Sequence, residues 1–440
     1  MHTVSKDKIP TAKISRAIIT AKTTAKITLK HTTHLSKRAF LNPEKSEQHK
    51  IQHQQDIGKI LIAAFMQLRG TALKIAQLLS MELDLLPESI RKELSKACSE
   101  VSPLNRAHIH KVYKSEFAKA PDSMFYKFNS TAFAAASLGQ VHKATIKIED
   151  KKCQQLAIKI QYPGISATIK SDMKIVRTMM KSISVGTNLL PRYDVIDKIL
   201  NRINEQLQQE VDYRLEAKNT QWFKDKLNIP NIRVPKIYTQ FSGSKVLATE
   251  FIEGLHLNPW LANKPNQRQR NRMGQLLFGL FCFQLHELKV LHADPHPGNI
   301  LFCEDGQIAL IDFGCVHHLQ TDYPKQLNNL FTRDPQQLYQ TYQDMKIIKS
   351  TLDFEIFRKE FFPVVEDMLT WMTRPFINGN YDFSDMPAMP AKPLSQVSNA
   401  MKHVDAVQKD QMYFDRSFFG LLFMLRKLGA TINTSGMLLA

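Results

Sequence analysis

Apolar residues follow a helical spacing through most of this chain and a strand-like alternation in one central part. The stretch 57–81 carries almost no charge and predicts one long apolar helix that ends near Pro87, with a further helix from there to about Ser99. Farther on the apolar runs shorten, and 141–148 and 155–160 predict an antiparallel hairpin around a charged turn. The chain is therefore expected to begin with helices and then to form a small sheet.

The remainder is predicted to be largely helical. Two helices are expected first, at 165–184 and 194–226, and then two strands, at 233–238 and 245–251. From Arg268 onward nearly every segment has a helical pattern, except 290–316, which predicts loop, strand, turn and strand. No repeat of fixed period occurs, which excludes solenoid and propeller folds.

The first 43 residues are strongly basic, with nine Lys or Arg and one acid. Apolar residues at three- and four-residue spacing lie beside a parallel row of lysines, which predicts a basic amphipathic helix that could rest on anionic lipid. The apolar row is Ile14, Ile18, Ala21, Ala25 and Leu29, and the lysines are Lys22, Lys26 and Lys30. Threonines within the segment weaken the helix, so a solvated, frayed tail is an equal alternative.

Composition excludes several classes of protein. With 440 residues, of which 43% are hydrophobic, the chain is neither disordered nor a miniature disulfide-stapled protein. Five scattered cysteines without a CxxC pair indicate free thiols in a reducing compartment, and no apolar stretch is long enough to span a bilayer. The net charge of +18 favours an anionic partner, but the charge is concentrated in the tail and no nucleic-acid motif is present. We therefore expect no nucleic-acid binding.

Two polar residues interrupt the apolar helix near its end. Lys74 and Gln77 are three residues apart and share a helix face. A lysine among apolar neighbours must either extend its ammonium group to solvent or pair with an anion. Periodicity alone favours the first of these interpretations.

The strongest chemical signal is an HxD-x4-N motif followed by DFG. Phosphoryl transfer needs an acid near the attacking hydroxyl or water, an amide oxygen that holds a metal, and a second carboxylate that links the metal to the phosphates. Asp294, Asn299 and Asp312 have the spacing that supplies these three groups. The motif pair predicts a magnesium-dependent phosphoryl-transfer or ATP-hydrolysing site.

Lys159 lies inside the second strand of the predicted hairpin. Its surroundings match the VAIK pattern, in which a strand lysine holds the nucleotide phosphates and is fixed by a helix carboxylate. The alternative is a lysine that keeps an edge strand soluble. Candidate partners are Glu205, Glu210 and Asp212, of which the first and last share a face if the helix continues.

Together these motifs resemble the UbiB (AarF-type) family of atypical protein-kinase-like proteins, which supports ubiquinone biosynthesis. The resemblance covers about residues 57–320. It includes the KxGQ motif at Lys74–Gln77, with Ala76 in place of glycine, and ExD at Glu210–Asp212. The other motifs are the alanine-rich loop at Ala134, Ala135, Ala136 and Ser137, the lysine strand at 157–164, and HxDPHPGN with DFG.

The resemblance implies roles for residues that periodicity does not assign. Lys74 and Gln77 would lie over the active site, with Lys74 near the ExD acids. Glu205 would pair with Lys159, and the alanine-rich loop would cover the nucleotide. Backbone groups of the segment 250–254, at Glu250 and Ile252, are expected to bind adenine.

Two departures from protein kinases bear on the substrate. The nucleotide loop has three alanines and only Gly139, so its backbone cannot freely adopt the positive φ angles that let a glycine-rich loop wrap phosphates. No A-P-E follows DFG, and His296 stands two residues after Asp294, where protein kinases usually carry lysine. The pattern favours a small-molecule acceptor or water over a protein substrate.

These observations predict an α+β, protein-kinase-like fold of two lobes. The expected divisions are a basic tail at 1–50, a helical extension at 51–122, a small lobe at 123–253 and a helical large lobe at 254–440. The expected ligands are ATP or ADP and Mg²⁺, and the expected partners are a membrane surface or isoprenoid lipid and quinone-biosynthesis proteins. A catalytically silent, nucleotide-switched binding module is the alternative. The expected location is cytoplasmic at a membrane surface, or the mitochondrial matrix side if the tail is a transit peptide.

Overall fold

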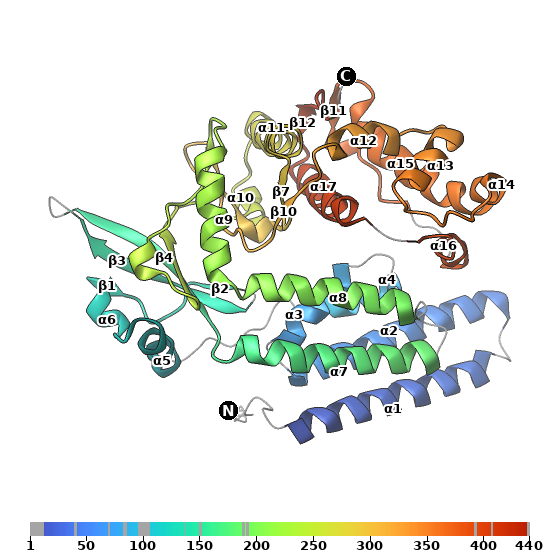
Figure 1. The fold of residues 1–440 in the computed structure, drawn as a ribbon, viewed down its shortest axis with the longest axis horizontal. Coiled ribbons are helices and arrows are strands. Elements are labelled where there is room, and N and C mark those ends of the chain that lie inside the picture. The colour runs from blue at the N-terminus through green and yellow to red at the C-terminus, as the bar shows by residue number, and fades with distance from the viewer. Residues whose placement is uncertain are drawn as a thin grey trace. The chain divides into compact units, whose positions relative to one another are not determined.

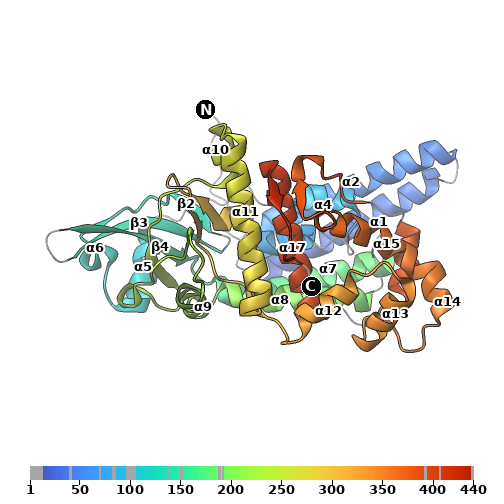
Figure 2. The same ribbon diagram turned by 90° about the horizontal axis from the view of Figure 1, so that it is seen from above.

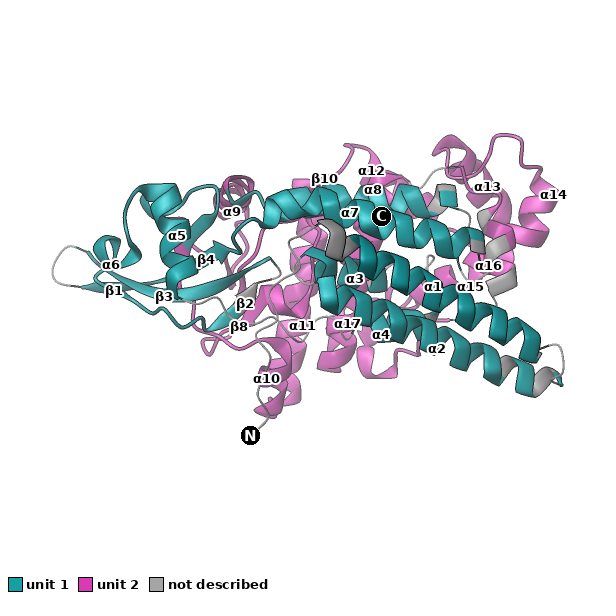
Figure 3. Cartoon of the chain, turned by 90° about the horizontal axis from the view of Figure 1, so that it is seen from below, with its two compact units in different colours: residues 1–213, 239–248 teal, residues 214–238, 249–440 magenta. Residues whose placement is uncertain are grey.

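Figure 1 shows the fold in a computed structural model of the chain. The structure describes residues 13–38, 42–68, 71–81, 86–95, 106–136, 138–148, 152–186, 190, 193–390, 394–405 and 408–437. The chain forms two compact units, coloured separately in Figure 3. Unit 1 comprises residues 1–213 and 239–248, and unit 2 comprises residues 214–238 and 249–440.

Unit 1 joins a helical layer to a sheet. Its helices are α1 (Lys13–Arg38), α2 (Pro43–Leu68), α3 (Thr71–Met81), α4 (Glu88–Leu94), α5 (Arg106–Phe117), α6 (Pro121–Met124), α7 (Ile165–Gly186) and α8 (Tyr193–Glu210). In Figure 1, α1 lies beside α2 and α7 beside α8. A continuous apolar core fills the space among α2, α3, α4, α7 and α8.

The sheet of unit 1 contains the predicted hairpin. Its strands are β1 (Lys127–Phe128), β2 (Ala134–Ala136), β3 (Gly139–Lys147), β4 (Cys153–Gln161) and β6 (Val246–Glu250), in the order β1-β3-β4-β6 with β2 paired to β3. The antiparallel register places Val141 opposite Lys159. Alternating burial along β3 and β4 shows that one face of the hairpin packs inward, as the alternating sequence predicts.

Two segments that the sequence pattern predicts as single helices each form two helices in the structure. The expected helix 57–81 is two elements, α2 and α3, and Gly70, a poor helix former, lies between them outside the described residues. The expected helix 194–226 is likewise two elements, α8 and α9 (Tyr213–Lys226). The prediction that Glu205 and Asp212 share a helix face is therefore wrong.

Unit 2 is mainly helical and includes the short strands predicted near residue 300. Its further helices are α10 (Leu257–Ala262), α11 (Gln267–Phe283), α12 (Tyr323–Leu330), α13 (Pro335–Asp344), α14 (Phe354–Ile356), α15 (Phe362–Thr373), α16 (Leu394–Met401) and α17 (Lys409–Leu428). Its strands are β5 (Ile232–Arg233), β7 (Val290–His292), β8 (Ile300–Phe302), β9 (Ile308–Leu310), β10 (Val316–His318), β11 (Asn380–Asp382) and β12 (Thr431–Asn433). Figure 2 shows α11 and α17 side by side, and both contribute to one large apolar core.

The basic tail forms helix α1, but its buried face is not the one that the apolar row predicts. Ile27 is 1% exposed, whereas Ile18 and Leu29 of the predicted row are 48% and 67% exposed. The helix therefore packs through a different stripe and leaves apolar and basic residues on its outer side. None of the described helices combines the length and the apolar character needed to cross a membrane.

Four histidines gather where α1 packs on α2. The Nδ1 of His31 lies 3.2 Å from the Nε2 of His53. The ring of His34 stacks on those of His53 and His49, with centroid separations of 4.1 and 4.7 Å. Burial first, and then the other three histidines, lower the pKa of His53 to about 4, against a smaller opposing effect of Asp56. Burial in this cluster therefore favours the neutral form of His53.

Acidification should weaken the pairing of α1 with α2. The pKa of His53 falls from 6.5 to about 4 on folding, so its contribution to stability is full above pH 6.5 and is lost as the pH falls through 4. The loss amounts to roughly 3 kcal/mol in the free energy of unfolding. We expect His53→Gln to flatten the decline of the urea unfolding midpoint between about pH 7 and 4. The control His108→Gln, at an exposed histidine, should leave the decline unchanged. Equal slopes in both variants would contradict this view.

Candidate active site

Lys159 lies on β4, between β3 and β6, and not on an edge strand. The solubility interpretation of this lysine is therefore wrong. Its Nζ lies 5.0 Å from the centre of the buried Tyr213 ring, at the start of α9. The lysine is half-buried and held by the most regular part of the sheet.

The alanine-rich segment is a strand and not an open loop. Ala134, Ala135 and Ala136 form β2, which pairs antiparallel with the start of β3. At Gly139 a Cβ would lie 2.3 Å from the carbonyl oxygen of Ile160, so only glycine fits there. The predicted nucleotide contact at Ser137 lies outside the described residues.

Lys74 is buried in an ion pair and does not extend to solvent. Its Nζ lies 3.0 Å from Glu210 Oε1, and the two side chains are only 7% and 11% exposed. Gln206, one turn earlier on α8, donates a hydrogen bond to the same carboxylate oxygen. The snorkelling interpretation from periodicity is thus wrong. The ion pair to an ExD acid that the resemblance implies is present.

The other two candidate partners of Lys159 lie at exposed positions. Glu205 and Asp212 are both exposed, on α8 and just after it, and Gln77 is half-buried on α3. A carboxylate that sequence reasoning missed, Glu216, is 2% exposed on α9. A Cβ built on Gly314 of the DFG motif would lie 3.7 Å from Glu216 Oε2. Glu216 thus has the burial expected of a helix carboxylate at a kinase-like site.

The loop after β7 holds Asp294 and Asn299 together. Asn299 Nδ2 donates to Asp294 Oδ2 at 2.8 Å and to the Asp294 carbonyl at 3.0 Å. The backbone N–H of Ile311 donates to the Asn299 carbonyl and so joins this loop to the segment that leads to DFG. Because Nδ2 is committed to Asp294, Asn299 Oδ1 remains the acceptor available for a cation.

Asp312 is placed by contacts on both sides. Its Oδ1 accepts from the backbone N–H of Gly314 at 3.0 Å, and its carbonyl oxygen accepts from His292 Nε2. The next residue, Phe313, is fully buried, and its carbonyl accepts from Asn219 Nδ2 at 3.0 Å. A carboxylate and an amide oxygen form a donor set that suits Mg²⁺, which retains waters and substrate phosphates as its other ligands. Among the described residues, no three or more His, Cys, Asp or Glu side chains form a preformed metal cage.

The predicted adenine-binding segment follows β6. The carboxylate of Glu250 pairs with Arg233 at 3.0 Å, and its backbone N–H donates to the Lys236 carbonyl. Ile252 is 5% exposed and packs in a small cluster with Leu301 and Ala309. The side chains of Glu250 and Ile252 therefore face the protein, and any adenine contact of these two residues would come from the backbone.

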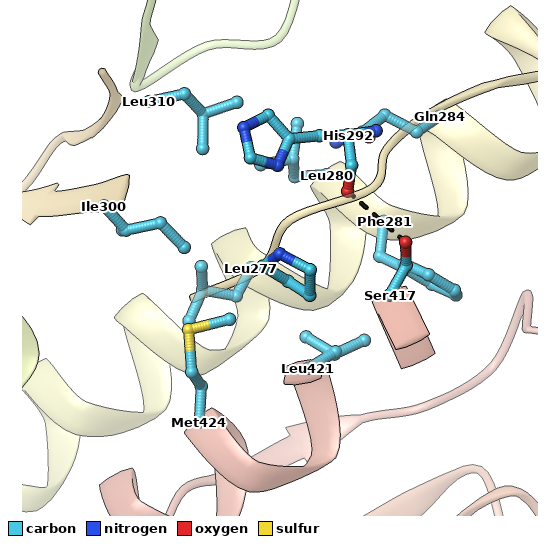
Figure 4. Close-up of a pocket in the computed structure, with 11 residues that line it drawn as sticks. Leu277, Leu280, Phe281, Gln284, His292, Ile300, Leu310, Ser417, Leu421 and Met424 are labelled. Carbon is cyan, nitrogen blue, oxygen red and sulfur yellow. Dashed lines mark hydrogen bonds between the residues drawn. The ribbon is translucent and has the colours of Figure 1, made fainter. Parts of the chain in front are cut away.

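A small cavity lies beside the loop that follows β7 (Figure 4). Its volume is about 40 Å³, far below the roughly 300 Å³ of a typical small-molecule site. Its lining is mainly apolar and includes His292 and Ser417, whose Oγ donates to the His292 carbonyl at 3.3 Å. The cavity is a packing feature that cannot hold a nucleotide.

The fold is that of a kinase-like protein. A family model described as the ABC1 atypical kinase-like domain matches residues 96–342. The chain therefore belongs to the ABC1 family of atypical kinase-like proteins, as the resemblance to UbiB (AarF-type) proteins predicts.

Relatives and a solved structure agree with this assignment. Protein ACTIVITY OF BC1 COMPLEX KINASE 7, chloroplastic, from Arabidopsis thaliana is 31% identical over 335 residues, 74% of this chain and 46% of that protein. Probable serine/threonine-protein kinase abkA from Dictyostelium discoideum is 28% identical over 275 residues, 59% of this chain and 47% of that protein. The chain thus spans about half the length of these relatives. Mycobacterium tuberculosis Rv3197, solved in complex with erythromycin, has the same fold, with a TM-score of 0.59, 23% identity, and coverage of 90% of this chain and 96% of that one.

Breaking the buried ion pair should cost much more than breaking an exposed one. Glu210→Gln leaves the Lys74 ammonium buried without its carboxylate and should lower the free energy of unfolding by about 3 kcal/mol. The control Asp122→Asn removes the exposed partner of Arg106, 3.0 Å away, and should cost at most about 1 kcal/mol. In urea unfolding, Lys74→Met combined with Glu210→Gln should cost less than the sum of the single changes. Additive costs would contradict a coupled pair.

Proposed function

We propose that the protein binds Mg²⁺ and an adenine nucleotide, and hydrolyses ATP or transfers its phosphate to a small molecule in support of isoprenoid-quinone biosynthesis at a membrane. The observation that supports this most directly is the hydrogen-bonded pair of Asp294 and Asn299, joined through the Ile311 N–H to the strand end that carries Asp312. A protein that only binds partners has no need of three such groups. Their preorganisation favours turnover.

Each residue has a distinct part in this proposal. Asp294 would orient the attacking water or hydroxyl, and Asn299 Oδ1 with the Asp312 carboxylate would hold Mg²⁺, which neutralises charge on the phosphates. Lys159 would bind the nucleotide phosphates. For the helix carboxylate of the kinase-like site, the burial of Glu216 supports that residue better than the exposed Glu205.

A small-molecule acceptor or water is proposed because protein-docking features are missing from the sequence. No A-P-E follows Asp312, and residue 296 is histidine. The pairing of β2 with β3 fixes the alanine-rich segment as a strand, which limits its ability to wrap a γ-phosphate. Lys74, Gln77 and the ExD acids would shape access to the site, as the family resemblance implies.

ATP turnover should depend on Asp312. We expect phosphate release from Mg-ATP by the intact protein, and Asp312→Asn should lower the rate at least about 100-fold because a metal carboxylate is lost. Glu304→Gln, an exposed acid in the turn before β9, is the matched control and should retain the rate. If the intact protein and Asp312→Asn released phosphate at the same background rate, the protein would have no ATPase activity. The result would then favour the alternative, a catalytically silent binding module in which the nucleotide acts only as a structural switch.

The outer face of α1 should bind anionic membranes. Exposed Ile18 and Leu29 lie on the same helix as exposed Lys22 and Lys26, a combination that favours an anionic lipid surface. In vesicle sedimentation we expect the protein to bind phosphatidylserine vesicles, and Lys22→Glu with Lys26→Glu to weaken binding by about 10-fold or more. The control Lys427→Glu, on α17, should bind normally. Binding that is unaffected by the α1 substitutions would place the lipid surface elsewhere.

A further inference from the structure

Helix α17 contacts the loop that carries Asp294. Arg416 Nη2 donates to Asp294 Oδ1 at 2.6 Å, and the two side chains are 18% and 20% exposed. The next residue, Ser417, donates to the carbonyl of His292 at the end of β7, as Figure 4 shows. A helix far along the chain thus supplies two polar contacts to one short loop.

Gly420 shows that this approach is built into the helix. It lies four residues after Arg416 and therefore on the same face. A Cβ at this position would lie 2.3 Å from Pro295 Cγ and 2.9 Å from Pro295 Cβ, so α17 can come this close only because the residue has no side chain. Close packing of α17 against Pro295 therefore brings the backbone of Arg416 near Asp294, so the contact does not depend only on the length of a flexible side chain.

The Asp294 carboxylate is consequently held from two sides. Asn299, within the loop, donates to Oδ2, and Arg416, from α17, donates to Oδ1. Charge-assisted hydrogen bonds of this kind are roughly twice as strong as neutral ones, so they fix the orientation of the carboxylate.

The loop itself has no lysine for this task. His296 stands where protein kinases usually carry one, and its Nδ1 accepts from the backbone N–H of Gly298 at 3.0 Å. That ring nitrogen therefore supports the turn at Pro297–Asn299. The arginine beside Asp294 comes from α17, elsewhere in the chain.

We propose that Arg416 is a positioning residue for the reaction, the cation that helix α17 supplies in place of the catalytic-loop lysine of protein kinases. It acts through Asp294, whose carboxylate it orients toward the attacking water or hydroxyl. This inference rests on the proposed function. It also makes the packing of α17 on Pro295 a requirement for turnover.

The test measures turnover and binding separately. Arg416→Gln should lower kcat for Mg-ATP at least about 10-fold, because misplacement of a reacting group is costly, while the dissociation constant for Mg-ADP stays within about 2-fold. Arg416→Lys should recover part of the rate. Arg426→Gln, at an exposed arginine on the same helix, is the matched control and should behave like the intact protein.

A second variant tests whether a lysine in the loop that carries Asp294 can replace Arg416 of α17. His296→Lys combined with Arg416→Gln should turn over ATP faster than Arg416→Gln alone, with His296→Lys alone as the reference. A purely structural ion pair predicts no such rescue, because the lysine would restore no packing between α17 and the loop.

The outcomes separate this inference from the proposed function. Normal turnover in Arg416→Gln, or faster turnover, which would mean an inhibitory contact, overturns the inference alone. Loss of turnover together with loss of Mg-ADP binding and of rescue by both lysine variants also overturns it, because the pair then only stabilises the fold. No turnover in the intact protein overturns the proposed function and this inference together.

Discussion

The end of α8 is the constraint on which much of unit 1 depends. Gln161, at the end of β4, donates to the Val211 carbonyl at 2.6 Å, directly after the last helical residue, Glu210. Glu210 pairs with Lys74 in the last turn of the helix, and Tyr213, just after the break, lies buried beside Lys159. The hydrogen bond from Gln161 thus ties the end of β4 to the end of α8, close in sequence to both the ion pair and the strand lysine. A helix that continued past Glu210 would leave Glu210 in place but would rotate Tyr213 to another face.

In unit 2, hydrogen bonds from side chains fix the loop that follows β7. Its loop after β7 is short and carries few apolar side chains, so it cannot be fixed by burial alone. Hydrogen bonds from Asn299 and Arg416 hold Asp294, while His292 and Gly314 hold Asp312. Groups held in this way need little reorganisation when a charged substrate binds, which is the physical basis of electrostatic catalysis.

Local patterns predicted the hairpin, the strand lysine and the loop after β7, because alternation and motif spacing are encoded within a few residues. Local patterns did not predict features that depend on tertiary contacts. The break after α8 depends on Gln161, fifty residues away, and the burial of Lys74 depends on Glu210. Periodicity contains neither contact; the family resemblance supplied the second. The alanine-rich segment was expected to be a loop and became β2, because β3 offers it a pairing edge.

Arg416 lies 122 residues from Asp294 and belongs to no motif, so no reading of the sequence alone could have placed it. It also lies outside residues 96–342, the part that matches the family domain, as does Lys74. Each of these cations meets a carboxylate inside that part, Asp294 and Glu210. The matched domain therefore carries acids whose partners come from α3 before it and α17 after it. Since a carboxylate in a partly buried position depends on its counter-charge, the flanking helices are electrostatic components of the kinase-like fold and not appendages to it.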